Sequence, residues 1–328
     1  MAEPLLEVKN LKKYFPVKQT KLLQKRGEVR AVDNVSFHME QGEILGLVGE
    51  SGSGKTTVGK TVLNLLTPTG GSVRFEGQTL FDVEAGVHLG KREMVQMRKN
   101  MQMVFQDPYA SLDPRMNVER IITEGIVKFG TVPRRELHER AEALIQECGL
   151  EPSSLKKFPH QFSGGQRQRI GIARAISLEP KLVVCDEPTA ALDVSIQSQI
   201  LNLMLALKEQ HGMSYLFISH NLGIVEHFCT RVCVMYLGSI VETAPSAELF
   251  RASQHPYTAA LLEATPSVRS DGSGRTLLTG EIPSPANPPS GCKFHPRCPR
   301  ATARCREEVP ELRDLGGGHQ VACHLAGT

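Results

Sequence analysis

The feature that most constrains this chain of 328 residues is a glycine-rich stretch with a single lysine. Gly49-Glu50-Ser51-Gly52-Ser53-Gly54-Lys55-Thr56 fits the pattern G-x-x-x-x-G-K-[ST] at every fixed position. The apolar residues 43–48 predict a buried strand before it, and residues 57–66 predict a helix after it. Glycines let backbone amides approach phosphate oxygens, and a helix N-terminus favours an anion. The sequence therefore predicts a strand, a phosphate-binding loop and a helix in succession.

This loop is expected to bind a nucleoside triphosphate together with Mg²⁺. Lys55 is placed to reach the β- and γ-phosphates, and the Thr56 hydroxyl is placed to ligate the metal ion. The predicted contacts of the triphosphate are Gly49, Ser51, Gly52, Ser53, Gly54, Lys55, Thr56 and Thr57.

A second motif ends an apolar run at residues 181–188 with two acidic side chains, Asp186 and Glu187. A run without polar alternation suits a parallel strand that is covered on both faces. Ligand-binding residues in such folds lie at the carboxyl ends of strands. Asp186 is therefore expected to hold Mg²⁺, and Glu187 to orient and deprotonate an attacking water.

Four further motifs occur in a fixed order around these two. They are Gln106 within Val104-Phe105-Gln106-Asp107-Pro108, the stretch Phe162-Ser163-Gly164-Gly165-Gln166, the triplet Ala191-Leu192-Asp193, and His220 within Ile218-Ser219-His220-Asn221. Together with the phosphate loop and the acidic pair, they resemble the Q-loop, signature, D-loop and switch histidine of ABC-type ATPases. The resemblance covers roughly residues 5–245.

The resemblance implies an ATPase that works as a head-to-tail pair, with each nucleotide enclosed between two chains. Ser163, Gly164, Gly165 and Gln166 are expected to face the nucleotide on the partner chain. His220 is expected to hold the γ-phosphate and the water against Glu187. Gln106 is expected to sense the water and Mg²⁺, of which it is also a predicted ligand. An aromatic residue near the first strand stacks on adenine in this family; Phe15 is the preferred residue here, with Tyr14 as the alternative.

The predicted fold is α/β: a P-loop NTPase core of the ABC ATPase type with an inserted helical subdomain and a small cysteine-rich C-terminal extension. Residues 1–106 and 166–250 are expected to form the core, 107–165 the helical subdomain with the signature, and 251–328 the C-terminal region. Strands are predicted at 5–9, 30–38 and 215–218, and helices at 118–128 and 134–148.

The C-terminal part narrows the substrate class. His255-Pro256-Tyr257, followed later by Ser284-Pro285-Ala286-Asn287-Pro288-Pro289-Ser290-Gly291-Cys292, is similar to the ATP-binding subunits of oligopeptide and dipeptide importers. This resemblance implies transport of peptides or of another small solute such as a nickel chelate. Residues 263–291 are rich in Pro, Gly and Ser and predict a linker.

The last four of the eight cysteines cluster after this linker, at Cys292, Cys298, Cys305 and Cys323. Disulfides are disfavoured in a cytosolic protein, and four thiolates suit zinc or an iron–sulfur cluster. The spacings match neither zinc-ribbon pairs nor the short ferredoxin run. In the resembled importers this pattern holds a [4Fe–4S] cluster, which is the favoured prediction; zinc is the second choice, and metal-free thiols are the third.

Composition limits the partners. With a net charge of +3 and no tryptophan, the chain has neither a strong polyanion-binding field nor a base-stacking platform, so no nucleic-acid partner is expected. The first residues do not resemble a signal peptide, and no apolar run approaches the roughly 20 residues that span a bilayer. The chain is therefore expected at the cytoplasmic face of the inner membrane, as a peripheral subunit.

The expected partners are two transmembrane permease subunits, a second, non-identical ABC ATPase and, indirectly, a periplasmic or extracellular peptide-binding protein. The expected function is ATP hydrolysis that powers uptake of dipeptides and oligopeptides. The segment 107–118 is expected to receive the permease, with Tyr109 and Leu112 as contacts. The alternative is a soluble ABC ATPase that acts on DNA or ribosomes. Such proteins usually carry two cassettes or a long insertion, and this chain has neither.

Overall fold

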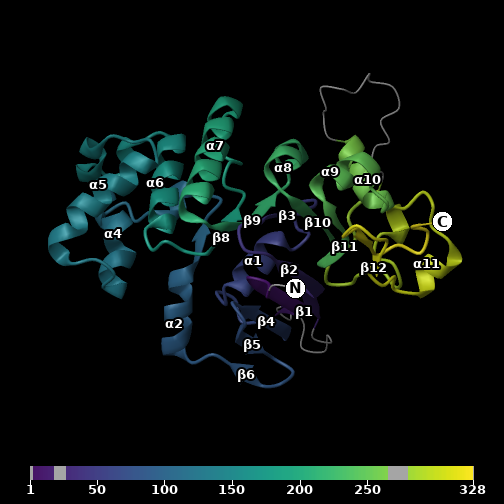
Figure 1. Ribbon diagram of the computed structural model, residues 1–328. Helices are drawn as coiled ribbons and strands as arrows, with labels where there is room; N and C mark the ends of the chain where they lie inside the picture. Colours follow the sequence, from purple (N-terminus) through teal and green to yellow (C-terminus); the bar gives the residue numbers. More distant parts are fainter. Residues whose placement is uncertain (1–2, 18–26, 265–279, 328) are drawn as a thin grey trace. The chain divides into compact units, whose positions relative to one another are not determined.

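The computed structural model describes residues 3–17, 27–264 and 280–327 (Figure 1). These residues divide into two compact units. The first unit comprises Met1–Glu40, Ile44–Leu89 and Ser219–Thr328, and it contains the phosphate loop and the C-terminal region. The second unit comprises Gln41–Glu43 and Gly90–Ile218, and it contains the acidic pair and the signature sequence.

An antiparallel sheet with the strand order β2-β1-β4-β5-β6 forms one part of the first unit. Its strands are β1 (Leu6–Pro16), β2 (Glu28–Met39), β4 (Gly70–Phe75), β5 (Gln78–Asp82) and β6 (Val87–His88). Apolar residues at every second position of β2, such as Val35, Phe37 and Met39, are buried. This alternation is typical of a sheet that covers a core with one face.

The other strands of the first unit carry the phosphate loop. In β3 (Ile44–Val48) every residue is buried, and this strand pairs in parallel with β10 (Arg231–Tyr236). From β10 the pairing continues antiparallel through β11 (Ser239–Pro245), β13 (Gln320–Val321) and β12 (Arg313–Asp314). The helices of this unit are α1 (Lys55–Val62), α8 (Leu222–Phe228), α9 (Ser246–Ala252), α10 (Pro256–Glu263), η4 (His295–Arg297) and α11 (Ala303–Glu307).

The second unit contains three parallel strands, with β8 (Leu182–Asp186) between β7 (Met101–Val104) and β9 (Ser214–Ser219). Its helices are α2 (Lys91–Asn100), α3 (Pro108–Ser111), α4 (Val118–Phe129), η1 (Arg134–Glu136), α5 (Leu137–Glu147), η2 (Pro152–Lys156), η3 (Pro159–Gln161), α6 (Gly164–Ile176) and α7 (Val194–His211). Helices α4, α5 and α6 pack against one another, as Figure 1 shows. Ile122, Ile145 and Ile170 are among the fully buried residues of these helices.

The α/β fold class and the order of the elements agree with the sequence prediction. Residues 107–163, all of them described, form only helical elements. Helix α1 begins two residues earlier than predicted and ends at Val62, because Asn64 has a left-handed φ of 50°. The division into three domains remains a prediction, and residues 265–279 of its C-terminal part lie outside the described residues. Among the described residues, no helix combines the length and apolar character needed to cross a membrane.

Candidate nucleotide site

The phosphate loop joins β3 to α1 in the first unit, as the sequence predicts. Gly54 precedes the helix with a φ of +104°, and a Cβ at this position would lie 2.1 Å from the carbonyl oxygen of Ala31. Only glycine can satisfy both conditions. At Gly54 the loop therefore lies directly against strand β2, with no space for a side chain.

The Lys55 ammonium is buried within the loop. Its Nζ donates to the carbonyl oxygens of Gly49 and Glu50 at 2.8 and 2.9 Å, and to Oγ of Ser53 at 3.3 Å. An ammonium has three donors and no acceptor, so it is surrounded by oxygen partners of the kind that a phosphate also supplies. The lysine is thus located where the motif requires it.

The other predicted loop residues differ in exposure. Ser51 and Gly52 are exposed at the tip of the loop, whereas Ser53 is 5% exposed. Thr56 and Thr57 are half-buried in the first turn of α1. A hydroxyl at this position is a hard oxygen ligand that suits Mg²⁺.

The two candidate adenine-stacking residues have different surroundings. Phe15 is half-buried, and the Nζ of Lys13 lies 4.8 Å from the centre of its ring. The Tyr14 hydroxyl donates to Oδ1 of Asp33 at 2.5 Å. Burial and this hydrogen bond raise the pKa of Tyr14 to about 12. Because Tyr14 is held by Asp33, Phe15 stays the preferred candidate for stacking.

His220 is exposed immediately after β9 and precedes Asn221, whose side chain caps α8 by accepting from the N–H of Ile224. The cap fixes the backbone next to the histidine. The structure thus places His220 at the end of a strand, and its role at the γ-phosphate stays a prediction.

The second unit brings three predicted residues together at the carboxyl ends of β7 and β8. Asp186 is the last residue of β8 and is 3% exposed. Glu187 follows it, and its Oε2 accepts a hydrogen bond from Nε2 of Gln106 at 3.0 Å. Gln106 is separated from Glu187 by 81 positions, so the parallel pairing of β7 with β8 creates this contact.

The backbone of Glu187 is in the left-handed region, with a φ of 45°. Its N–H donates to the carbonyl oxygen of Ile218 at 2.9 Å, and its own carbonyl oxygen accepts from the N–H of Ala190 at 3.2 Å. Such dihedrals are costly for a residue with a Cβ and persist only where neighbouring contacts hold them, often at functional sites.

The signature sequence begins helix α6. Ser163 is its N-cap: Oγ accepts from the N–H of Gln166 at 3.3 Å, and Oε1 of Gln166 accepts from the N–H of Ser163 at 3.0 Å. This reciprocal capping box leaves the serine exposed at the start of a helix of 13 residues.

A Cβ at Gly165 would lie 2.6 Å from Cγ2 of Ile196, so glycine allows α6 to approach α7. Gly164 is exposed beside it, and Asp193 is exposed at the N-terminus of α7.

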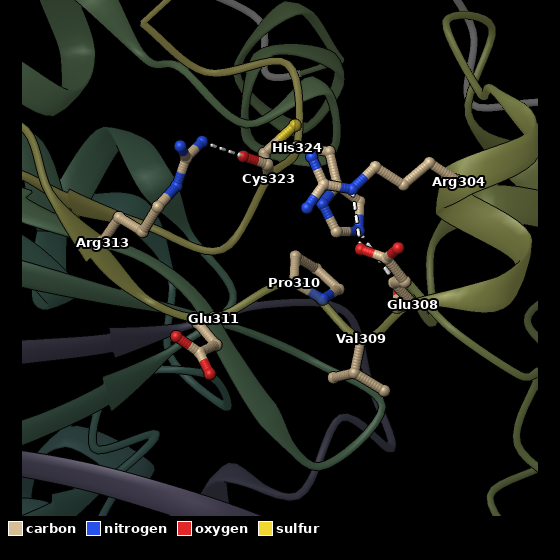
Figure 2. Close-up of a pocket in the computed structure, with 8 residues that line it drawn as sticks. All are labelled: Arg304, Glu308, Val309, Pro310, Glu311, Arg313, Cys323 and His324. Carbon is tan, nitrogen blue, oxygen red and sulfur yellow. Dashed lines mark hydrogen bonds and ion pairs between the residues drawn. The ribbon is translucent and has the colours of Figure 1, made fainter.

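The four C-terminal cysteines are all free thiols; Cys305 and Cys323 are buried, and Cys292 and Cys298 are partly exposed. Burial in the first place, with a smaller effect of the charges of the other three thiols, raises the pKa of Cys292 to about 11. Cys323 lines a pocket of about 330 Å³ together with Arg304, Glu308, Val309, Pro310, Glu311, Arg313 and His324 (Figure 2). Within the described residues, however, no three His, Cys, Asp or Glu side chains form a group that could hold a metal ion. The donor chemistry suits a metal, but the structure does not support the predicted metal site.

The structure adds contacts of the phosphate loop that the sequence analysis did not predict. The N–H of Glu50 donates to the Tyr257 hydroxyl at 2.9 Å, and the Glu50 carboxylate accepts from both terminal nitrogens of Arg297. The His255-Pro256-Tyr257 motif is the one sign of them in the sequence.

Comparison with known proteins agrees with this geometry. The family profile described as "ABC transporter" matches residues 32–190. A solved structure of CbiO1 from Clostridium perfringens, part of an ABC transporter complex, has a TM-score of 0.63 and 25% identity, over 76% of this chain and 92% of that one. The ATP-binding cassette MJ0796, solved as a dimer with ADP and Pi, has a TM-score of 0.64 and 26% identity, over 74% and 98%. The fold and the site define an ATP-binding cassette ATPase.

The C-terminal part of the chain shows to which group of ATP-binding cassette ATPases it belongs. A second profile, the C-terminal region of oligopeptide/dipeptide transporters, matches residues 241–305. The oligopeptide transport ATP-binding protein AppF of Bacillus subtilis is 49% identical over 326 residues, which cover 98% of both chains. The chain belongs to the family of ATP-binding subunits of oligopeptide and dipeptide ABC transporters.

Proposed function

We propose that this chain hydrolyses ATP to power the uptake of dipeptides and oligopeptides through an ABC importer. The observation that carries the proposal is the similarity to an oligopeptide transport ATP-binding protein along 98% of the chain, including the C-terminal region. The matched C-terminal profile supports the same substrate class.

The phosphate loop binds the triphosphate of ATP, and two chains enclose each nucleotide. In this arrangement Ser163 and Gly165 face the γ-phosphate held by the partner chain. The capping box at Ser163 supports this role, because it presents a hydroxyl and the N-terminal dipole of α6 at one place. Asp193 contributes at the same interface between the chains, and Phe15 stacks on adenine.

Hydrolysis requires a base beside the γ-phosphate. Glu187 takes a proton from the attacking water, Gln106 holds the Glu187 carboxylate and the water in place, and His220 contacts the γ-phosphate. The 3.0 Å hydrogen bond between Gln106 and Glu187 supports the first two assignments. Oxygen donors from Thr56, Asp186 and Gln106 would hold Mg²⁺, which neutralises charge on the phosphates.

The partners follow from the importer function. They are two transmembrane permease subunits, a second, non-identical ATPase chain and, through the permeases, a peptide-binding protein outside the membrane. The chain then acts as a peripheral subunit at the cytoplasmic face of the inner membrane. ATP binding closes the pair of ATPases, and hydrolysis followed by product release reopens it.

A narrower proposal concerns the cysteines. Cys292, Cys298, Cys305 and Cys323 hold a [4Fe–4S] cluster, or zinc as the alternative. The presence of these four cysteines within the last 37 residues of the sequence supports it. Anaerobically purified protein should absorb near 400 nm and contain iron and sulfide. Colourless protein with equimolar zinc would reject the cluster in favour of zinc, and protein without either metal would reject both.

The function is tested by purifying the tagged chain from its own membranes and identifying the captured proteins by mass spectrometry. Two permease subunits and a second ATPase are expected. The purified complex, reconstituted in vesicles with its binding protein, should accumulate labelled peptides only when ATP is present. Uptake of nickel instead of peptides would change the substrate class. Capture of ribosomes or DNA without permeases would contradict the importer function.

A further inference from the structure

Glu50, the second residue of the phosphate loop, is engaged through all three of its polar groups. Its carbonyl oxygen accepts from Nζ of Lys55 at 2.9 Å. Its N–H donates to the Tyr257 hydroxyl at 2.9 Å. Its carboxylate oxygens accept from Nη1 and Nη2 of Arg297 at 2.8 and 3.1 Å. One loop residue therefore joins the phosphate-binding lysine to two residues of the C-terminal region.

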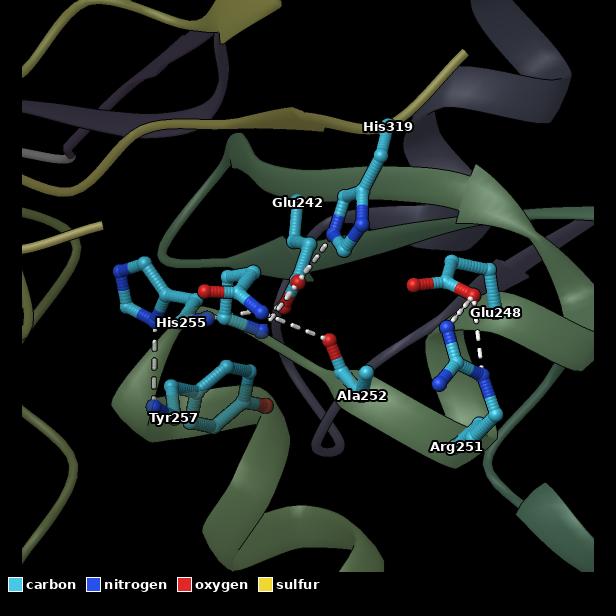
Figure 3. Close-up of polar contacts among 8 residues, drawn as sticks. Glu242, Glu248, Arg251, Ala252, His255, Tyr257 and His319 are labelled. Atoms are coloured by element: carbon cyan, nitrogen blue, oxygen red, sulfur yellow. Dashed lines mark hydrogen bonds and ion pairs between the residues drawn. The ribbon is translucent and has the colours of Figure 1, made fainter. Parts of the chain in front are cut away.

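The Tyr257 hydroxyl is presented by a rigid support. Tyr257 is fully buried, and its ring centre lies 4.7 Å from that of Tyr236 and 5.4 Å from that of Phe294. Figure 3 shows the polar contacts at the start of α10: Nδ1 of His255 accepts from the N–H of Tyr257 at 3.1 Å. The fully buried Glu242 carboxylate accepts from the N–H of His255 at 3.1 Å. Neither the ring nor the helix start can shift without breaking these contacts.

Arg297 is also held firmly. Its side chain is 4% exposed, and its guanidinium lies 5.9 Å from the centre of the Tyr236 ring. A paired guanidinium–carboxylate contact fixes direction as well as distance, which a lysine could not reproduce. The Glu50 carboxylate is 25% exposed, so solvent screens this pair only in part.

A second link runs through Lys293, four residues before Arg297. Its Nζ donates to Oδ2 of Asp33 at 2.8 Å, to the carbonyl oxygen of Leu237 at 2.9 Å and to Oγ of Ser239 at 2.7 Å. The turn held in this way contains Gly238, whose N–H donates to the carbonyl oxygen of Ser53. The C-terminal region thus contacts the phosphate loop directly at Glu50 and indirectly at Ser53.

We propose that Arg297 and Tyr257 are positioning residues of the nucleotide site, and that through Glu50 they set how tightly the phosphate loop holds ATP. This inference rests on the proposed function, because it assumes that the loop binds ATP. It assigns to the C-terminal region a role in nucleotide affinity. These contacts order the phosphate loop before ATP binds, so binding does not carry the entropic cost of ordering it.

The test uses the full chain and compares Arg297→Met and Tyr257→Phe with Arg304→Met. Tyr257→Phe keeps the buried ring and removes only the hydroxyl. Arg304 serves as the control, because its ion pair with Glu308 is exposed in the same region and does not involve the phosphate loop. The readouts are the Kd for a fluorescent ATP analogue, KM and kcat for ATP, and the thermal midpoint.

We expect KM and Kd to rise about tenfold for Arg297→Met and about threefold for Tyr257→Phe, with kcat within about twofold of wild type. Arg304→Met should leave all three constants unchanged. Glu50→Gln combined with Arg297→Met should bind ATP no more weakly than Arg297→Met alone, because both changes remove the same contact.

Two results would overturn the proposal: folded Arg297→Met and Tyr257→Phe proteins with wild-type KM and Kd, or fully additive losses from Glu50→Gln and Arg297→Met. A fall in kcat with unchanged KM and Kd in Arg297→Met and Tyr257→Phe would likewise reject a role in setting affinity. Absence of ATP binding by the wild-type chain is a different outcome, since it would overturn the proposed function itself.

Discussion

Nε2 of Gln106 donates to Oε2 of Glu187 at 3.0 Å, and the acceptor belongs to a residue with a left-handed backbone. The amide thus holds a carboxylate whose own backbone is in an uncommon conformation. A carboxylate held in this manner suits a base that must meet a water molecule at a fixed place.

Replacing Glu187 with Gln removes the base and keeps the size of the side chain. We expect kcat for ATP hydrolysis to fall at least about 100-fold, the usual loss for a general base. ATP should still bind and should hold two chains together. Phosphate release measures the first effect, and size-exclusion chromatography with and without ATP measures the second. Normal turnover would remove Glu187 from this role.

Replacing Gln106 with Ala tests the orientation of the base separately from its presence. Because the carboxylate remains but loses the hydrogen bond from Gln106, we expect a fall in kcat of about tenfold, smaller than that for Glu187→Gln, with KM for ATP little changed. Steady-state kinetics at several ATP concentrations separates the two constants. An equal rise in KM would indicate a role in binding ATP.

Glycine at position 165 is required by packing, whereas Gly171 in the same helix has open space around it. Gly165→Ala should lower the free energy of unfolding by ~1–3 kcal/mol, because its Cβ would collide with Ile196. Gly171→Ala should raise it by up to ~1 kcal/mol, because alanine favours a helix. Urea unfolding measures both. Ile196→Ala should relieve part of the Gly165→Ala loss, and no relief would place the strain elsewhere.

The buried His255 predicts a pH dependence of stability. Burial lowers its pKa to about 3 from the usual 6.5, so in the acid range the unfolded chain binds the proton that the folded chain excludes. Stability should therefore fall as the pH drops from 6.5 towards 3, by at most ~1.4 kcal/mol per pH unit from this residue. His255→Asn keeps a cap for α10 without titrating, and should lose less stability between pH 7.5 and 5.0 in urea unfolding. Equal losses in both proteins would exclude His255 as the cause.

The two residues predicted to contact the permease, Tyr109 and Leu112, differ in how far they are exposed. Tyr109 is 62% exposed, with Arg167 over its ring, whereas Leu112 is 2% exposed and cannot offer its side chain to a partner. Tyr109→Ala should reduce peptide transport while the isolated chain still hydrolyses ATP. Leu112→Ala should instead lower stability by ~2–5 kcal/mol. Reconstituted transport and urea unfolding distinguish these effects. Unchanged transport by Tyr109→Ala would exclude this contact.

Sequence patterns predicted those parts of the site that local spacing encodes. They include the glycine and lysine of the phosphate loop, the acidic end of β8, and the signature stretch at residues 162–166, each of which lies within one short segment. The contacts of Glu50 with Tyr257 and Arg297 do not, because ion pairs between distant segments leave no periodic signal. The same reason explains Leu112: its burial depends on neighbours that the helical pattern of its own segment does not specify.

The distance in sequence between Glu50 and Arg297 also sets the order in which these two segments become available during synthesis. The two residues are 247 positions apart, so during synthesis the phosphate loop is made long before its guanidinium partner. At roughly 5–20 residues per second, a nascent chain spends about 12–50 seconds with the loop but without this ion pair. The loop gains this contact only after the segment around Arg297 has been synthesised, so the ion pair that holds Glu50 forms much later than the loop itself is made.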